Sequence, residues 1–250
     1  MHAQHPQHEP SGEGAPELPP EIVELQELAM ELVDSGRYEE AEPAMRELLT
    51  AYERHLGPGD PETLALYGAL GHTLFERNLL PEAEAMSREA YERSVRLFGA
   101  DAPETLAHAH NLGAVLAMGD EREEGTALVA DTLERRDAVL GPVHPDSLDT
   151  VSLLGALLFA AGDQQAGHAL LDRAYTGFQE ALGPDDPRTL DIGGNLVAAL
   201  HALGHRQEAG LLLLDIFKRY ARTLGPYHEL TVATQQRLRR MGWNVTITDA

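Results

Sequence analysis

A nine-residue connector recurs five times along this chain of 250 residues. Its first copy, residues 56–64, reads Leu-Gly-Pro-Gly-Asp-Pro-Glu-Thr-Leu, and the glycines of the five copies are Gly57, Gly99, Gly141, Gly183 and Gly225. The period is therefore 42 residues, without an insertion or a deletion. A fixed period between about 20 and 50 residues is typical of proteins built from stacked repeats. The pattern predicts one continuous solenoid rather than separate globular domains.

Each connector is expected to join two helices. A glycine directly after a leucine can end a helix in the left-handed conformation, and a proline at the first helical position favours the start of the next helix. Asp60 and Asp186 precede this proline in two of the copies. We predict that their side chains cap the helices that follow.

We expect two helices in each repeat, helix A after a connector and helix B before the next one, and leucines at the repeat period mark helix A. One register holds Leu28, Leu70, Leu112, Leu154, Leu196 and Leu238, and a second, four residues later, holds Leu32, Leu74, Leu116, Leu158 and Leu200. A spacing of four places both registers on one helical face. Helix A of each repeat is expected near residues 21–35, 62–77, 104–118, 146–161, 188–203 and 229–241. Helix B is expected near residues 39–55, 81–97, 123–139, 165–181 and 207–223.

Small residues predict that the two helices of each hairpin lie close together. Helix A carries Gly71, Gly113 and Gly155, and helix B carries Ala41, Ala83, Gly125, Gly167 and Ala209 at a matching register. The turns between the helices contain Gly36, Asn78, Gly119-Asp120, Gly162 and Gly204, which tolerate a left-handed cap.

Asn111-Leu112-Gly113, followed by Leu116 and by Gly125-Thr126-Ala127, resembles the tetratricopeptide repeat. The 42-residue period and the connector are similar to those of the longer repeats of kinesin light chains and their bacterial relatives. This resemblance covers residues 21–241 and implies an all-α fold. It implies a right-handed α-solenoid of antiparallel helix pairs, with about five helix hairpins and a C-terminal capping helix.

Two tails are predicted to flank the solenoid of residues 21–241. Residues 1–20 contain five prolines and no apolar periodicity, so we expect a disordered arm. Residues 242–250 alternate between apolar and polar side chains, which predicts an extended tail. Trp243 is expected to fold back on the last helix pair; the alternative is that this tail docks on a neighbouring molecule.

The sequence offers few features that favour catalysis. It has no cysteine, no phosphate-binding glycine loop, and neither the His-Glu-x-x-His nor the Gly-x-Ser-x-Gly motif. His2, His5 and His8 lie in the predicted arm, where their spacing fixes no metal geometry. We therefore expect no enzymatic activity, no cofactor and no metal site.

Charge and hydropathy restrict the classes of partner. The chain has 41 acidic and 19 basic residues, a net charge of −22, which argues against binding nucleic acid or an anionic membrane. Residues 1–56 carry a charge of −10 and residues 205–242 carry +4, so the charges permit weak head-to-tail contact, and a monomer or weak dimer is expected. Without an apolar run of about 20 residues, a cytoplasmic location is the expectation.

In tetratricopeptide repeat proteins the A helices line the concave face, so the resemblance also implies a binding site. Its candidate peptide-binding residues are His72, His110, Asn111, Asp149, Ser152, Asp191, Asn195 and His201. Asn111 and Asn195 match the asparagine with which the family contacts ligands, and an amide can pair with both N–H and C=O of a peptide. The alternative is that these amides only bridge neighbouring helices.

Charge in this predicted groove indicates the kind of peptide. Across the hairpins none of the predicted concave positions is Lys or Arg, whereas Asp149 and Asp191 hold equivalent positions in adjacent repeats. A groove of this sign favours partners with arginine, lysine or a free amino terminus. The leading hypothesis is a non-catalytic, cytoplasmic adaptor or scaffold that binds a protein or peptide. The alternatives are a regulatory sensor of a short signalling peptide and an assembly subunit that associates through the solenoid ends.

Overall fold

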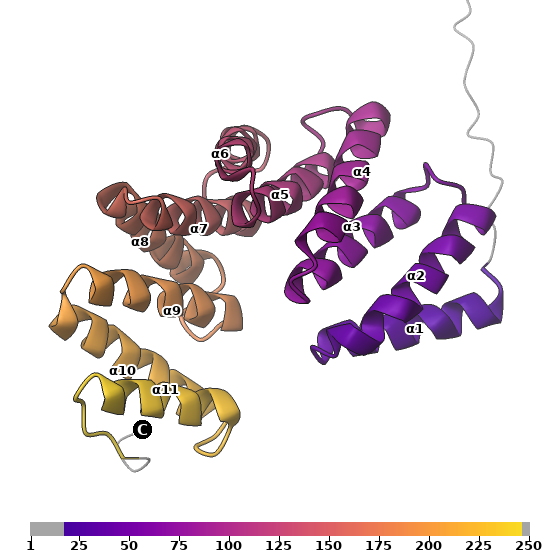
Figure 1. Ribbon diagram of the computed structural model, residues 1–250. Coiled ribbons are helices and arrows are strands. Elements are labelled where there is room, and N and C mark those ends of the chain that lie inside the picture. Colours follow the sequence, from indigo (N-terminus) through magenta and orange to yellow (C-terminus); the bar gives the residue numbers. More distant parts are fainter. Residues whose placement is uncertain (1–17, 247–250) are drawn as a thin grey trace, which may run out of the picture.

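A computed structural model describes residues 18–246 of the chain (Figure 1). These residues form eleven helices and no strand, and the all-α prediction is confirmed. The helices are α1 (Pro20–Asp34), α2 (Tyr38–His55), α3 (Pro61–Glu76), α4 (Leu80–Phe98), α5 (Pro103–Met118), α6 (Arg122–Val139), α7 (Pro145–Ala160), α8 (Gln164–Ala181), α9 (Pro187–Ala202), α10 (Arg206–Thr223) and α11 (Glu229–Arg240). The odd-numbered helices are the predicted A helices and the even-numbered ones the B helices. The helices form an α-solenoid of five hairpins closed by α11.

The connectors behave as their residue types predict. Their five glycines have φ angles between 88° and 98°, a region that favours glycine. Asp60 and Asp186 accept hydrogen bonds from the backbone N–H groups two residues later, so both predicted caps are confirmed. His144 and His228 cap α7 and α11 in the same way through Nδ1, which the sequence analysis did not anticipate. In the turn after α5, Gly119 has a φ of −86° and is not left-handed, contrary to the prediction.

Small residues bring the helices of the central hairpins together. A Cβ placed on Gly125 in α6 would lie 2.7 Å from the carbonyl oxygen of Gly113 in α5 and would also clash with the backbone of Ala117. Gly155 in α7 and Gly167 in α8 approach each other in the same way. The predicted close packing is therefore confirmed for these two hairpins.

The leucine register that begins with Leu28 is buried in every later repeat but exposed in the first. Leu112 is 2% exposed and Leu154 is 9% exposed, whereas Leu28 in α1 is 49% exposed. No described helix precedes α1, so no preceding hairpin covers Leu28. The expectation that Leu28 packs like its equivalents was wrong for this reason.

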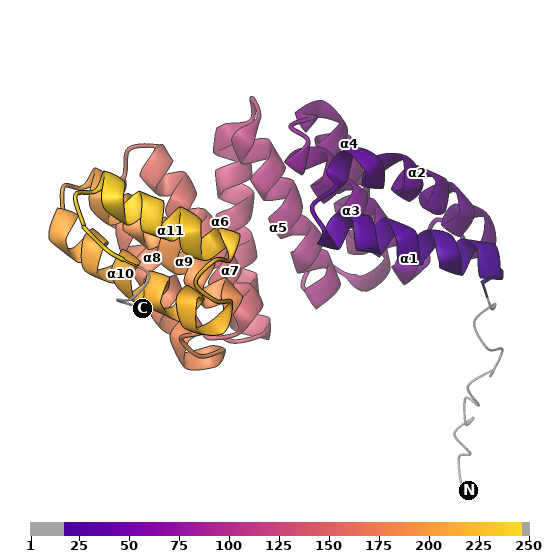
Figure 2. The same cartoon turned by 90° about the horizontal axis from the view of Figure 1, so that it is seen from below.

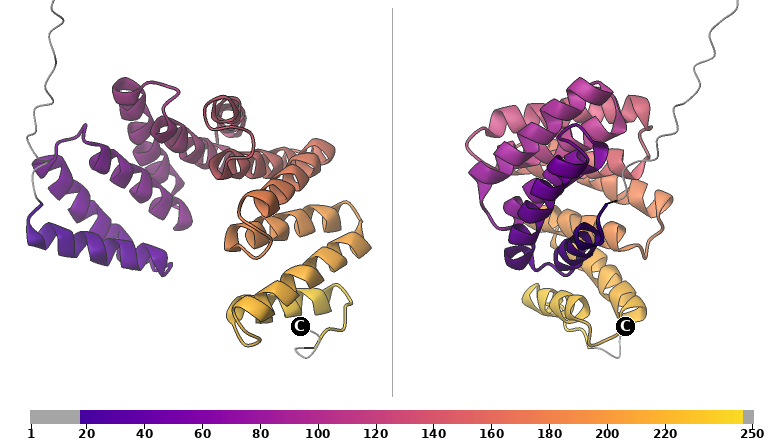
Figure 3. Two further views of the ribbon diagram at one scale, coloured as in Figure 1. Left: turned by 180° about the vertical axis from the view of Figure 1, so that it is seen from behind. Right: turned by 90° about the vertical axis from the view of Figure 1, so that its right-hand side faces the viewer.

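The stack follows an arc whose two ends are formed by α1–α2 and by α10–α11 (Figures 1 and 3). In the middle, α6 lies on the outer side of the arc, and α5 and α7 lie nearer its opening (Figure 1). At the C-terminal end, α11 lies beside α10 (Figure 2). Among the described helices, none combines the length and the apolar composition that a membrane span requires.

The C-terminal segment packs back on the last hairpin. Trp243 contacts Gly210 in α10, and Val245 is 5% exposed. Gln235 in α11 donates a hydrogen bond to the carbonyl oxygen of Val245 at 3.1 Å. The predicted folding back of Trp243 is confirmed, while residues 247–250 and most of the predicted arm, residues 1–17, lie outside the described residues.

Arginines 42 residues apart tie helix B of one repeat to the connector before it. Arg93 donates to Pro58 O at 2.9 Å, Arg135 to Asp101 at 3.1 Å, and Arg219 to Asp185 at 2.9 Å. The series is interrupted at Gly177, where a Cβ would lie only 2.5 Å from a methyl carbon of Leu148. These arginines tie three of the five connectors to the B helix that follows.

Candidate binding groove

The inner side of the solenoid carries two grooves between successive A helices. The first, which we call the α3–α5 groove, consists of adjoining cavities of about 320 and 190 Å³ that share His72 and Asn111. The second, the α9–α11 groove, consists of cavities of about 590 and 300 Å³ that share Ala198, Arg237 and Arg240. The predicted site residues are therefore divided between two places.

The α3–α5 groove is mostly apolar. Small side chains such as Ala69 and Ala107 lie along it, and Phe75 and Leu153 border its smaller cavity. His108 lies on its wall and is 9% exposed, and burial lowers the pKa of its imidazole. Such a lining suits an apolar side chain of an extended peptide.

Asn111 is the polar group best placed in this groove. It is half-buried and borders both cavities, together with the exposed His72. An amide in this position can accept from and donate to a peptide backbone while neighbouring side chains enter the two cavities. The structure brings these two predicted residues together.

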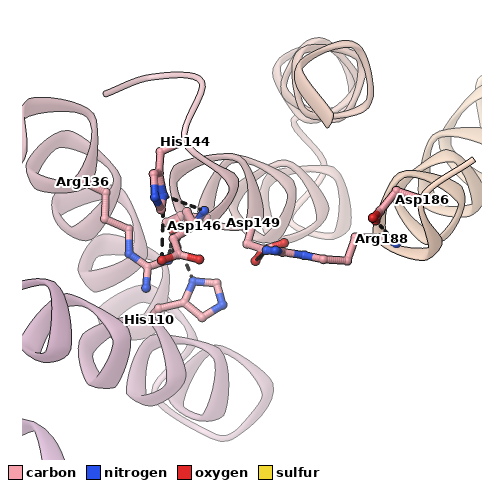
Figure 4. A network of polar contacts seen from close by, with 8 residues as sticks. His110, Arg136, His144, Asp146, Asp149, Asp186 and Arg188 are labelled. Atoms are coloured by element: carbon pink, nitrogen blue, oxygen red, sulfur yellow. Dashed lines mark hydrogen bonds and ion pairs between the residues drawn. The ribbon is translucent and has the colours of Figure 1, made fainter. Parts of the chain in front are cut away.

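His110 borders the smaller cavity but takes part in an internal network (Figure 4). Its Nδ1 lies 3.3 Å from Thr150 Oγ1, which also accepts a hydrogen bond from Arg136 at 2.8 Å. Arg136 is 5% exposed and donates to the carbonyl oxygen of Asp146 at 2.6 Å. Burial, with the nearby Arg136, lowers the pKa of His110 to about 4. His110 is therefore neutral near pH 7, and its Nδ1 faces protein rather than ligand.

Asp149 and Ser152 lie on α7, between the two grooves. Ser152 is 4% exposed, so its hydroxyl is not open to a ligand. Asp149 accepts a hydrogen bond from Arg188 in the first turn of α9 (Figure 4). The Arg188 guanidinium also lies 5.1 Å from the centre of the Phe178 ring. Burial raises the pKa of Asp149, and Arg188 opposes this shift. The carboxylate thus has an internal cation as its partner.

The α9–α11 groove contains the remaining predicted residues. Asp191 and Asn195 line its larger cavity, and His201 lines its smaller one. Asp191 accepts a hydrogen bond from the hydroxyl of Tyr220 at 3.3 Å, and partial burial raises its pKa. In contrast to Asp149, Asp191 forms no ion pair within the described residues.

Arginines enter the concave face, which corrects the expectation of a groove without basic residues. Arg237 and Arg240 of α11 line the α9–α11 groove, and Arg188 reaches Asp149. The first two lie 42 residues after Asn195 and Ala198, so extending the concave register into the capping helix would have found them. Burial and the nearby Arg240 lower the pKa of Arg237.

The fold agrees with several solved structures. A protein from Podosopora anserina assigned as a kinesin light chain with nearly identical TPR-like repeats has a TM-score of 0.63 at 22% identity, covering 83% of this chain and 98% of that one. BtubC (BKLC) from P. vanneervenii has a TM-score of 0.64 at 21% identity, covering 83% and 82%. The thermophilic TPR protein TTC0263 from Thermus thermophilus has a TM-score of 0.61 at 18% identity, covering 88% and 98%. At these identities the likeness concerns the fold alone.

Family models extend the agreement to the sequence. No curated protein sequence matches the chain. Models of the tetratricopeptide repeat match residues 21–94, 105–146 and 147–188. Because these matches cover more than half of its length, the chain belongs to the tetratricopeptide repeat family.

Proposed function

We propose that this protein is a non-catalytic scaffold that holds an extended segment of a protein or peptide partner along its concave face. The observation that carries the proposal is the pair of grooves between successive A helices, each with an asparagine, Asn111 or Asn195, among its lining residues. Tetratricopeptide repeat proteins in general serve protein interaction, which supports the same class of function. A cytoplasmic location is part of this proposal.

The charges of the two grooves indicate which chemical groups the partner carries. Asp149 is already paired with Arg188. We therefore assign the recognition of a basic side chain or a free amino terminus to Asp191, which lines the α9–α11 groove. The apolar α3–α5 groove takes an uncharged side chain of the same segment. The partner therefore carries an apolar portion and a basic or amino-terminal group.

The first test is to purify the protein from its host and to identify a retained peptide or partner by native mass spectrometry. Affinity for that partner is then measured calorimetrically with the double variant Asn111→Ala/Asn195→Ala. Each lost neutral hydrogen bond is worth about 0.5–1.5 kcal/mol, so affinity should fall up to about tenfold for each amide. Gln165→Ala, on an exposed position of the B helix α8, is the matched control and should leave affinity unchanged.

A charge-reversed pair tests the role of the two aspartates. Asp191→Lys should reject basic partners and admit acidic ones, since like charges in a groove repel, whereas the same change at Asp149 breaks the internal pair with Arg188 and serves as the comparison. Each variant is first checked for unchanged helicity. If the Asp191→Lys protein keeps the partner and the affinity of the parent, the concave face is not the binding site.

Association through the solenoid ends is the second candidate function. The 49% exposure of Leu28, at a register buried elsewhere, favours it. Sedimentation at low and high salt distinguishes the two: an assembly subunit gains mass with protein concentration alone, whereas a scaffold stays a monomer or a weak dimer until its partner is added.

A further inference from the structure

The α9–α11 groove presents opposite charges on its two sides. Asp191 comes from α9, and Arg237 and Arg240 come from α11. All three line the cavity of about 590 Å³, yet among the described residues no ion pair links the aspartate to either arginine, and neither arginine pairs with another carboxylate. Charges of opposite sign on facing helices are thus left without charged partners.

Two of the three charged side chains, Asp191 and Arg237, form a hydrogen bond with a neutral neighbour. The Tyr220 hydroxyl donates to Asp191 at 3.3 Å, and Arg237 donates weakly to the carbonyl oxygen of Gly194 at 3.5 Å. Burial raises the pKa of Asp191 and lowers the pKa of Arg237, so both charged forms have lost part of their hydration. A ligand with complementary charges would replace that hydration by charge-assisted hydrogen bonds, which are stronger than neutral ones.

The same cavity is lined by apolar side chains as well as by the three charged ones. These apolar residues are only 2–3% exposed: Leu190, Leu213 and Ile216. The cavity volume lies within the range of about 300–1,000 Å³ that is usual for small-ligand sites. This lining can take an apolar side chain of a ligand with two charged ends.

We propose that this groove binds a short peptide with free ends, whose ammonium group pairs with Asp191 and whose carboxylate pairs with Arg237 and Arg240. The inference rests on the proposed function of the concave face and names the ligand class for its C-terminal part. The preceding repeat does not offer the same site, because its equivalent aspartate, Asp149, is paired with Arg188.

The test uses the full chain and three tripeptides in calorimetry: Ala-Leu-Ala with free ends, the same peptide acetylated at its amino end, and the same peptide amidated at its carboxyl end. The free peptide should bind, and blocking either end should weaken binding about tenfold or more, as expected for a hydrogen bond to a charged group.

Variants assign each end of the peptide to its side of the groove. In Asp191→Asn, acetylation should no longer cost affinity, while amidation still does. In Arg237→Gln/Arg240→Gln, the reverse should hold. A merely structural role of these residues would weaken all three peptides equally and leave the differences between them intact. Arg239→Gln, on the exposed side of α11, is the matched control and should retain both preferences.

Two results would overturn the inference: equal binding of free and blocked tripeptides, or no binding of any of them. The proposed function fails separately. If the tripeptides do not bind but a retained partner still depends on Asn111 and Asn195, only the assignment of this groove to a short peptide with free ends is lost.

Discussion

Arg188, in the first turn of α9, donates a hydrogen bond to the carboxylate of Asp149 in α7. The equivalent positions of three earlier repeats hold Glu62, Glu104 and Asp146, and acidic residues suit the positive end of the helix dipole. Arginine departs from this local preference. The ion pair with Asp149 compensates for it and neutralises the concave face between the two grooves.

Replacing Arg188 by glutamine should raise the pKa of Asp149 further, because Arg188 opposes the effect of burial. A raised carboxylate pKa disfavours folding above that pKa, so the variant should lose up to about 1 kcal/mol at pH 7. The deficit should shrink as pH falls through the folded-state pKa. An NMR titration of Asp149 and denaturation at several pH values measure both effects. Arg122→Gln removes a guanidinium that pairs with no described carboxylate and should change neither quantity.

Leu112→Ala should lower the free energy of unfolding by about 2–5 kcal/mol, through lost burial and a cavity at a side chain that is 2% exposed. Because solenoid repeats contact only their neighbours, weakening a central one should separate thermal unfolding into two steps. Leu28→Ala is the matched control at the same register. With 49% of Leu28 exposed, it should cost well under half as much. Equal losses would show that the first hairpin is covered in solution.

Gly125→Ala should destabilise the third hairpin by about 1–3 kcal/mol, because the new methyl group meets the backbone of α5. Gly194→Ala provides the opposite case. A Cβ there meets nothing within 4 Å in the interior of α9, so the higher helix propensity of alanine should stabilise the protein by up to about 1 kcal/mol. Urea denaturation of both variants checks the two signs, and a neutral Gly125→Ala contradicts the packing described for α5 and α6.

His110 should make the protein sensitive to mild acid. Its pKa is lowered to about 4 in the folded state, whereas an unperturbed histidine titrates near pH 6.5. Between these values the unfolded chain binds a proton that the folded chain does not, so the free energy of unfolding falls as pH drops, by about 3 kcal/mol in all. The free energy of unfolding, measured by denaturation at several pH values between 7 and 4, should fall less steeply with pH for His110→Gln than for the parent. Asp149 shifts stability in the opposite direction but is present in both proteins, and an unchanged slope would remove His110 as the cause.

The repeat period accounts for what could be predicted. It places every helix to within one residue at each end, because the same connector, the same leucines and the same small residues return at identical spacing. The period alone did not predict that Leu28 is exposed, because the exposure follows from the absence of a described helix ahead of α1. Arg237 was predictable in principle, since it continues the register of Asn195 into the capping helix.

Contacts of long side chains between repeats were beyond the sequence. The partner of Arg188 lies 39 residues earlier and depends on the angle between α7 and α9, which no periodicity specifies. The buried position of Arg136 was equally hidden. Its equivalents are Tyr52, Ser94, Phe178 and Tyr220, so the register alone does not predict a charge or its hydrogen bonds to α7.

The contact of Trp243 with Gly210 determines where further repeats could be added to the solenoid. The indole packs directly against Gly210 of α10, where any larger side chain would clash with it. A forty-two-residue unit added after α11 would therefore have to displace the indole. A unit inserted between two connectors does not meet the indole, because it leaves the contact between Trp243 and α10 in place. Lengthening of this array by gene duplication, or by a protein engineer, is therefore expected within the array, with the tryptophan lid carried along unchanged at its end.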